Sequence, residues 1–122
     1  MIWYYICNQI RLVMKFKFKI TEETTLDDAL DELNNLCKVN VNELPFNHIV
    51  KITEFLGAEL QKSPRGSQER FQHPLVSTFG GYFGVHVVHK GKDDVLIMKA
   101  NFKKYIYPHL VEIIEKKNAQ KE

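Results

Sequence analysis

The sequence predicts an α+β fold, and three observations support this. Three stretches carry apolar residues at helical spacing, others alternate apolar and polar residues as strands do, and the strand-like stretches follow one another in the middle of the chain. The chain has 122 residues, of which 44% are hydrophobic and 26% charged. That length and composition suit one compact globular unit with a single core.

The first predicted element is a strand between Ile10 and Ile20. Charged and apolar side chains alternate there, with Lys15, Lys17 and Lys19 facing one way and Phe16, Phe18 and Ile20 the other. The lysines are explained more simply as a solvated face that protects an edge strand than as a row of phosphate ligands. Met14 offers a second start codon beside Met1, so the start of translation stays open.

A helix is predicted from Leu26 to Leu36. Thr24 and Thr25 supply a cap, and Asp27 and Asp28 place negative charge in the first turn. Apolar residues recur at helical spacing, namely Leu26, Ala29, Leu30, Leu33, Leu36 and Cys37. We expect the acidic outer face of this helix to be a solvated surface without a catalytic role.

A second helix is expected after Pro45, because proline suits the first turn of a helix. Gly57 should end it, because glycine adopts the left-handed conformation of a helix C-terminus without steric cost. Three strands are then expected, over residues 58–61, 68–73 and 85–89. A loop over 63–67 and a connection containing Gly80, Gly81 and Gly84 separate them.

The C-terminal part is predicted less uniquely. Residues 95–98 are apolar and could form a fourth strand or begin a helix, since four residues are too few to distinguish the two periods. Pro108 is expected to open the last helix, whose inward positions would be Leu110, Val111, Ile113 and Ile114.

Composition narrows the functional classes. The formal net charge of +2 is too small for a strong general attraction to nucleic acid, so any such binding needs a local concentration of Lys and Arg. The apolar N-terminus is interrupted by polar residues and lacks a secretory leader, so we expect no membrane span and a cytoplasmic location. Cys7 and Cys37 lack metal-ligand spacing and are expected to be reduced packing residues, with no metal and no cofactor.

Short motifs in the C-terminal two thirds match a known pattern. They are Phe55 to Leu60, Arg65-Gly66-Ser67, Arg70 to Pro74, Val87-Val88-His89 and Pro108 to Ile114. These motifs resemble those of the HicA toxins of bacterial toxin–antitoxin systems, and the order of the predicted elements is similar to that of double-stranded-RNA-binding domains. The resemblance implies a dsRBD-like α-β-β-β-α domain over residues 45–122, after an additional N-terminal strand and helix over residues 1–44.

The resemblance also implies a function, namely a toxin that binds RNA and cleaves it as an mRNA interferase. Gln68 stands where the family has a catalytic histidine, and an amide cannot exchange a proton near neutral pH, so endoribonuclease activity stays open. His89 is the candidate base in its place. The implied partners are RNA and a HicB-type antitoxin, and a homodimer is also open. The alternative is a catalytically inactive RNA- or protein-binding module, encoded by a phage or mobile element.

The expected RNA-binding residues surround the loop between the first two strands of the predicted domain. They are Lys62, Arg65, Gly66, Ser67, Arg70 and His73. Cationic side chains and glycine backbone amides could meet a phosphate there. Composition alone favours an ordinary basic surface turn, and it is the resemblance that favours RNA. Phe79, Tyr82 and Phe83 could stack on bases, although a core or strand-pairing role is the simpler explanation.

Overall fold

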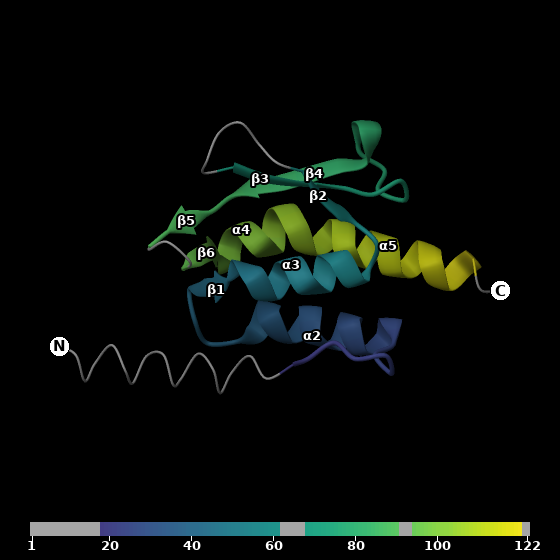
Figure 1. Cartoon of the computed structure of the whole chain (residues 1–122), viewed down its shortest axis with the longest axis horizontal. Coiled ribbons are helices and arrows are strands. Elements are labelled where there is room, and N and C mark those ends of the chain that lie inside the picture. The colour runs from purple at the N-terminus through teal and green to yellow at the C-terminus, as the bar shows by residue number, and fades with distance from the viewer. Residues whose placement is uncertain (1–17, 62–67, 91–93, 121–122) are drawn as a thin grey trace.

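The computed structural model describes residues 18–61, 68–90 and 94–120, and this part has the predicted α+β fold. Figure 1 shows a sheet on one side of the molecule, two helices beneath it and a third helix beyond them. The sheet is formed by β2 (Glu59–Gln61), β3 (Gln68–Gln72) and β4 (Tyr82–His86). The helices are α3 (Phe46–Phe55) and α5 (Tyr107–Gln120) in the middle and α2 (Leu26–Lys38) on the far side.

The N-terminal prediction is only partly confirmed. Residues 10–17 of the predicted strand lie outside the described residues, and Phe18, Lys19 and Ile20 do not form a strand. The helix is present as α2 and ends two residues later than expected. Thr25 and Asp28 form a reciprocal capping box, in which each side chain accepts a hydrogen bond from the backbone N–H of the other, at 3.1 and 3.0 Å.

Pro45 has two roles in the structure. It ends β1 (Glu43–Pro45) and is the N-cap residue of α3, so the second helix begins one residue after it. Gly57 follows the helix with a φ of 94°, as expected for a glycine at that position. The chain then enters β2, and β2 and β3 pair as an antiparallel hairpin with Glu59 opposite Gln72.

The strands form two antiparallel sheets of three, in the orders β2-β3-β4 and β1-β6-β5. The second sheet contains β5 (Val88–His89) and β6 (Val95–Met98). The prediction of one strand over residues 85–89 was therefore wrong: β4 begins at Tyr82, includes Gly84, and gives way to β5 at the buried Val87. The chain changes sheets there because β5 pairs with β6, which in turn pairs with β1.

The closing helix begins earlier than predicted. A short helix α4 (Lys99–Asn101) leads into a π-helical turn η2 (Phe102–Ile106) and then into α5, so Pro108 lies in the first turn of α5 and does not open the helix. Proline has no N–H to donate to the preceding turn. In the wide turn before it, the Tyr107 N–H donates to the Phe102 carbonyl. The three-strand order expected between α3 and the last helix is thus extended by β5 and β6.

One hydrophobic core joins these elements. Its largest fully buried side chains come from α2, β1, α3, β3, β6, η2 and α5, including Leu33, Leu44, Ile52, Phe71, Ile97, Phe102 and Ile113. α2 therefore packs into the same core as the C-terminal elements, and the expected boundary between residues 44 and 45 falls inside β1. The division into two parts stays a prediction. Within the described ranges, no helix has the length and apolar character needed to cross a membrane.

Candidate functional site

The β2-β3-β4 sheet has one covered and one open face. Successive side chains of a strand point to opposite faces, so Phe71, Phe83 and Val85 face the helices and are buried. The Phe71 and Phe83 rings stack with centroids 5.5 Å apart. The alternate residues of the same strands are exposed on the other face, namely Gln68, Arg70, Tyr82 and His86. In Figure 1 the helices α2, α3, α4 and α5 all lie on the other side of this sheet.

Two side-chain pairs connect β3 to β4 on the outer face. The Arg70 guanidinium carbon lies 4.5 Å from the centroid of the Tyr82 ring, which is a cation–π arrangement. Gln68 stands directly opposite His86, and its amide nitrogen is 3.3 Å from His86 Nε2. An amide nitrogen only donates, so Nε2 accepts, and a neutral His86 ring carries its proton on Nδ1.

These residues line a groove of about 680 Å³. Asn101 and Tyr105 line it too, and they come from the helical segment α4–η2, of which η2 packs against β4. Arg70 and Glu69 give the lining charges of both signs, while Lys104 Nζ lies 5.2 Å from the centroid of the Tyr105 ring and adds a positive charge beside it. Ligand sites of roughly 300–1,000 Å³ accept small organic groups, so the groove is large enough for a nucleotide.

His73 does not belong to this surface. It is 5% exposed, its Nδ1 accepts a hydrogen bond from the Leu75 N–H at 3.0 Å, and Nε2 lies 3.1 Å from the Leu56 carbonyl oxygen. The ring is therefore neutral with its proton on Nε2. Burial lowers the pKa of His73, and the charge of Lys117 lowers it further, against the opposing effect of the Leu56 carbonyl. His73 thus ties β3 to the end of α3 and does not reach a ligand on the outer face.

The other predicted site residues divide into two groups. Lys62, Arg65, Gly66 and Ser67 lie outside the described residues. His89 lies in β5, opposite Val95 of the second sheet, and is not part of the groove lining. Of the predicted RNA-binding and catalytic positions, the structure thus brings together Gln68 and Arg70.

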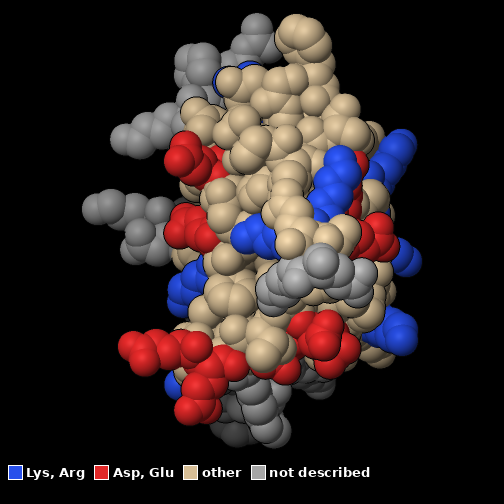
Figure 2. All heavy atoms as spheres, turned by 90° about the vertical axis from the view of Figure 1, so that its right-hand side faces the viewer, with Lys and Arg blue, Asp and Glu red and all other residues tan. Residues whose placement is uncertain are grey.

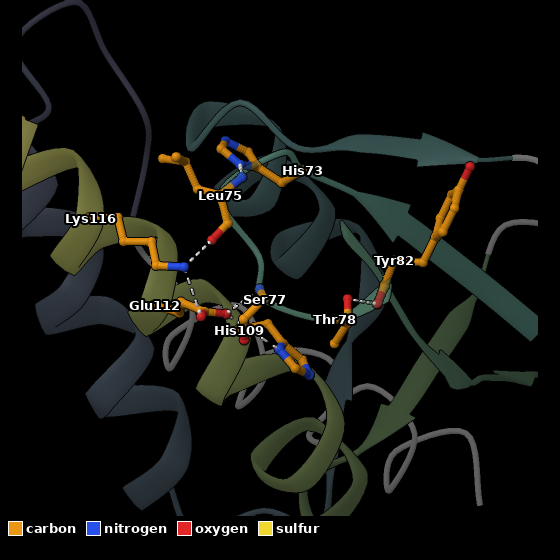
Figure 3. Close-up of polar contacts among 8 residues, drawn as sticks. All are labelled: His73, Leu75, Ser77, Thr78, Tyr82, His109, Glu112 and Lys116. Atoms are coloured by element: carbon orange, nitrogen blue, oxygen red, sulfur yellow. Dashed lines mark hydrogen bonds and ion pairs between the residues drawn. The ribbon is translucent and has the colours of Figure 1, made fainter. Parts of the chain in front are cut away.

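A second polar cluster holds the connection between β3 and β4 against α5, as Figure 3 shows. Glu112 accepts a hydrogen bond from the Ser77 N–H at 3.1 Å and pairs with Lys116 Nζ at 3.1 Å. Lys116 also donates to the Leu75 carbonyl at 2.7 Å. The Ser77 N–H is the main reason that the pKa of Glu112 falls to about 2, and the Ser77 hydroxyl and Lys116 lower it further.

Sequence reasoning missed Asn101 and Tyr105 as groove residues. They are four positions apart in a helical segment, so they share a face of it, but nothing local in the sequence places that face beside β4. His86 was visible as a histidine on a predicted strand, and only the strand register shows that it pairs with Gln68. Within the described ranges, no group of three or more His, Cys, Asp or Glu side chains is placed to hold a metal ion.

Comparisons with known proteins add no neighbour to this picture: no protein-family model, no curated protein and no solved structure matches the chain.

Proposed function

We propose that this chain binds RNA through the groove beside β4, which outer-face residues of the β2-β3-β4 sheet and the segment α4–η2 line together, as a HicA-like protein would. The observation that carries the proposal is the Arg70 guanidinium held over the Tyr82 ring on an open sheet face. A guanidinium plane offers both a positive charge for a phosphate and a flat surface for a base.

The remaining lining supports the same ligand. The amides of Gln68 and Asn101 can exchange hydrogen bonds with base edges, and the Tyr105 ring, which is 43% exposed, offers another stacking surface. Because Arg70 is the one Lys or Arg of the described lining and amide and aromatic side chains surround it, the groove suits bases at least as well as phosphates. This differs from the shape-reading of a duplex minor groove that the double-stranded-RNA-binding order suggests.

The binding proposal is tested with a fluorescently labelled RNA of 12 nucleotides. Arg70→Ala should weaken binding about 5- to 100-fold and reduce the dependence of affinity on salt by about one phosphate contact. Arg70→Lys keeps the charge but loses the planar stack, so it should restore the salt dependence and only part of the affinity. Lys51→Ala is the matched control, because Lys51 is an exposed cation on α3. Equal binding by the wild type and Arg70→Ala would refute the proposal and favour the protein-binding alternative.

RNA cleavage in a toxin–antitoxin system is the second part of the proposal. Cleavage by attack of a 2′-hydroxyl on the phosphorus needs a group that accepts the hydroxyl proton, and His86 is the imidazole in the groove lining. The 5′-oxygen that leaves the phosphorus would take its proton from water. The 2′-hydroxyl would have to replace the Gln68 amide at Nε2. If the groove cleaves RNA, expression should arrest growth, His86→Ala should relieve the arrest and His89→Ala should not. Relief of the arrest by His89→Ala but not by His86→Ala would make His89 the base. If expression causes no arrest, the chain binds RNA without cleaving it. Protection from arrest by co-expression of an adjacent small gene would identify a HicB-type partner.

A further inference from the structure

One aromatic side chain in the turn before β4 is fully exposed to solvent. Phe79 begins the single-turn helix η1 (Phe79–Gly81) and is 100% exposed. Single exposed apolar residues are common on protein surfaces and by themselves indicate nothing. What distinguishes Phe79 is how firmly its backbone is held.

Hydrogen bonds fix the turn at both ends. The Gly81 N–H donates to the Thr78 carbonyl and the His73 N–H to the Gly81 carbonyl, both at 3.0 Å. The Thr78 hydroxyl donates to the Tyr82 carbonyl at 2.6 Å, and the Gln72 amide donates to the Gly80 carbonyl at 3.2 Å. Phe79 therefore projects from a turn whose backbone conformation is set by its neighbours.

The same connection is attached to α5 by two further contacts. Ser77 donates its N–H to Glu112, and Leu75 accepts from Lys116, as described above (Figure 3). The backbone of the turn is already ordered, so a ligand that binds Phe79 has to restrict only the rotamers of its side chain.

The turn adjoins the groove through Tyr82. Gly80 has a φ of 72°, and a Cβ at Gly80 would lie 2.9 Å from the Tyr82 ring, so the backbone of the turn lies directly beside that ring. The Arg70 guanidinium in turn lies over the Tyr82 ring. Tyr82 therefore belongs to the groove lining and also lies beside the turn that carries Phe79.

The turn also lacks charge. Residues 74–81, Pro-Leu-Val-Ser-Thr-Phe-Gly-Gly, contain no charged side chain. Figure 2 shows a mostly uncharged surface at the top of this side of the molecule, where Figure 1 places η1. A phosphate would gain little there, whereas the flat, uncharged face of a nucleobase would gain a stacking partner.

We propose that Phe79 stacks on an unpaired base of the RNA, next to the nucleotide held at Arg70 and Tyr82, so that the ligand is single-stranded over this region. The inference depends on the RNA-binding function proposed above and specifies the class of RNA. In a duplex the bases are stacked on each other and their faces are not accessible to Phe79.

The experiment compares two labelled RNAs, a single-stranded 12-mer and a hairpin in which the same 12 nucleotides are paired. The wild type should prefer the single strand. Phe79→Ala and Phe79→Leu should weaken its binding about 5- to 150-fold, because Leu keeps apolar bulk but loses the ring, and Phe79→Trp should bind at least as well as the wild type. Since Phe79 is exposed, all three variants should keep the thermal unfolding midpoint of the wild type.

Salt dependence separates this inference from the function on which it depends. Phe79→Ala should lower the affinity at every salt concentration without changing the slope against salt, whereas Arg70→Ala should reduce the slope. Wild-type affinity in Phe79→Ala together with weak binding by Arg70→Ala would overturn the stacking role and leave RNA binding intact. Equal wild-type affinity for the strand and the hairpin would also overturn it. If the wild type binds neither RNA, both proposals fail.

Discussion

The two faces of the β2-β3-β4 sheet are made by the same strands and have opposite characters. On the inner face, the buried Phe71 ring stacks on Phe83 and lies 6.1 Å from Phe46 of α3. On the outer face, Arg70 and Tyr82 contact each other in the open. Because neighbouring residues of a strand point to opposite faces, the inner set can hold the fold while the outer set varies with the ligand.

The largest effect on stability is expected on the inner face. Phe71→Ala should lower the free energy of unfolding by about 3–5 kcal/mol, because it leaves a cavity beneath the sheet. Arg70→Ala, one position away on the outer face, should lower it by only about 0.5–1 kcal/mol, the value of an exposed cation–π contact. Urea unfolding followed by circular dichroism measures both. Similar losses for the two variants would mean that the outer face also holds the fold.

The next largest effect is expected at His73, which faces inward at the end of β3. His73→Ala should cost about 2–3 kcal/mol, because the Leu56 carbonyl and the Leu75 N–H both lose their partner.

This site also predicts a pH dependence. The pKa of His73 is lowered in the folded protein, so the unfolded chain binds more protons at this residue. The contribution of His73 to the free energy of unfolding is therefore complete only above the ordinary pKa of 6.5. Stability should therefore fall as the pH drops below about 6.5. The stability of His73→Ala should fall less steeply as the pH drops. An equally steep fall in this variant would mean that another histidine causes the pH dependence of stability.

A smaller effect than at Phe71 or His73 is expected where the connection between β3 and β4 meets α5. Glu112→Gln should lower the free energy of unfolding at pH 7 by about 1–2 kcal/mol, since Ser77 and Lys116 lose a charged acceptor that is itself partly exposed. The pKa of Glu112 is lowered to about 2, so its contribution is complete above 4.5 and is lost as the pH falls towards 2.

Glu115→Gln is the control for that variant, because Glu115 is exposed on the same helix. Unfolding measured at pH 7 and at pH 3 should show a clear difference between the two variants at the higher pH and a smaller difference at the lower one. A constant difference between them at both pH values would mean that the Glu112 carboxylate is not what holds the connection.

The sequence predicts local elements well and their partners poorly. The capping residues of α2, the glycine after α3 and the hairpin of β2 and β3 follow from short-range patterns, because those features depend on residues within a few positions. The change of sheets at Val87 depends on β1, more than 40 positions earlier, and no local pattern reports it. The resemblance pointed to Gln68 and Arg70, but the contribution of Tyr105 depends on how the last helix packs against β4.

The wide turn η2 has a consequence for any chain with a different length in this segment. A π-helical turn accommodates one more residue than a regular turn, and successive residues of a helix are rotated by about 100°. Removing one residue between Phe102 and Ile106 would let this turn wind as a regular α-helical turn, and the segment before it would stay close to its present alignment with α5, because the wide turn holds one residue more than a regular turn. A single deletion within this turn should therefore leave Asn101 at the groove and β6 aligned with β1.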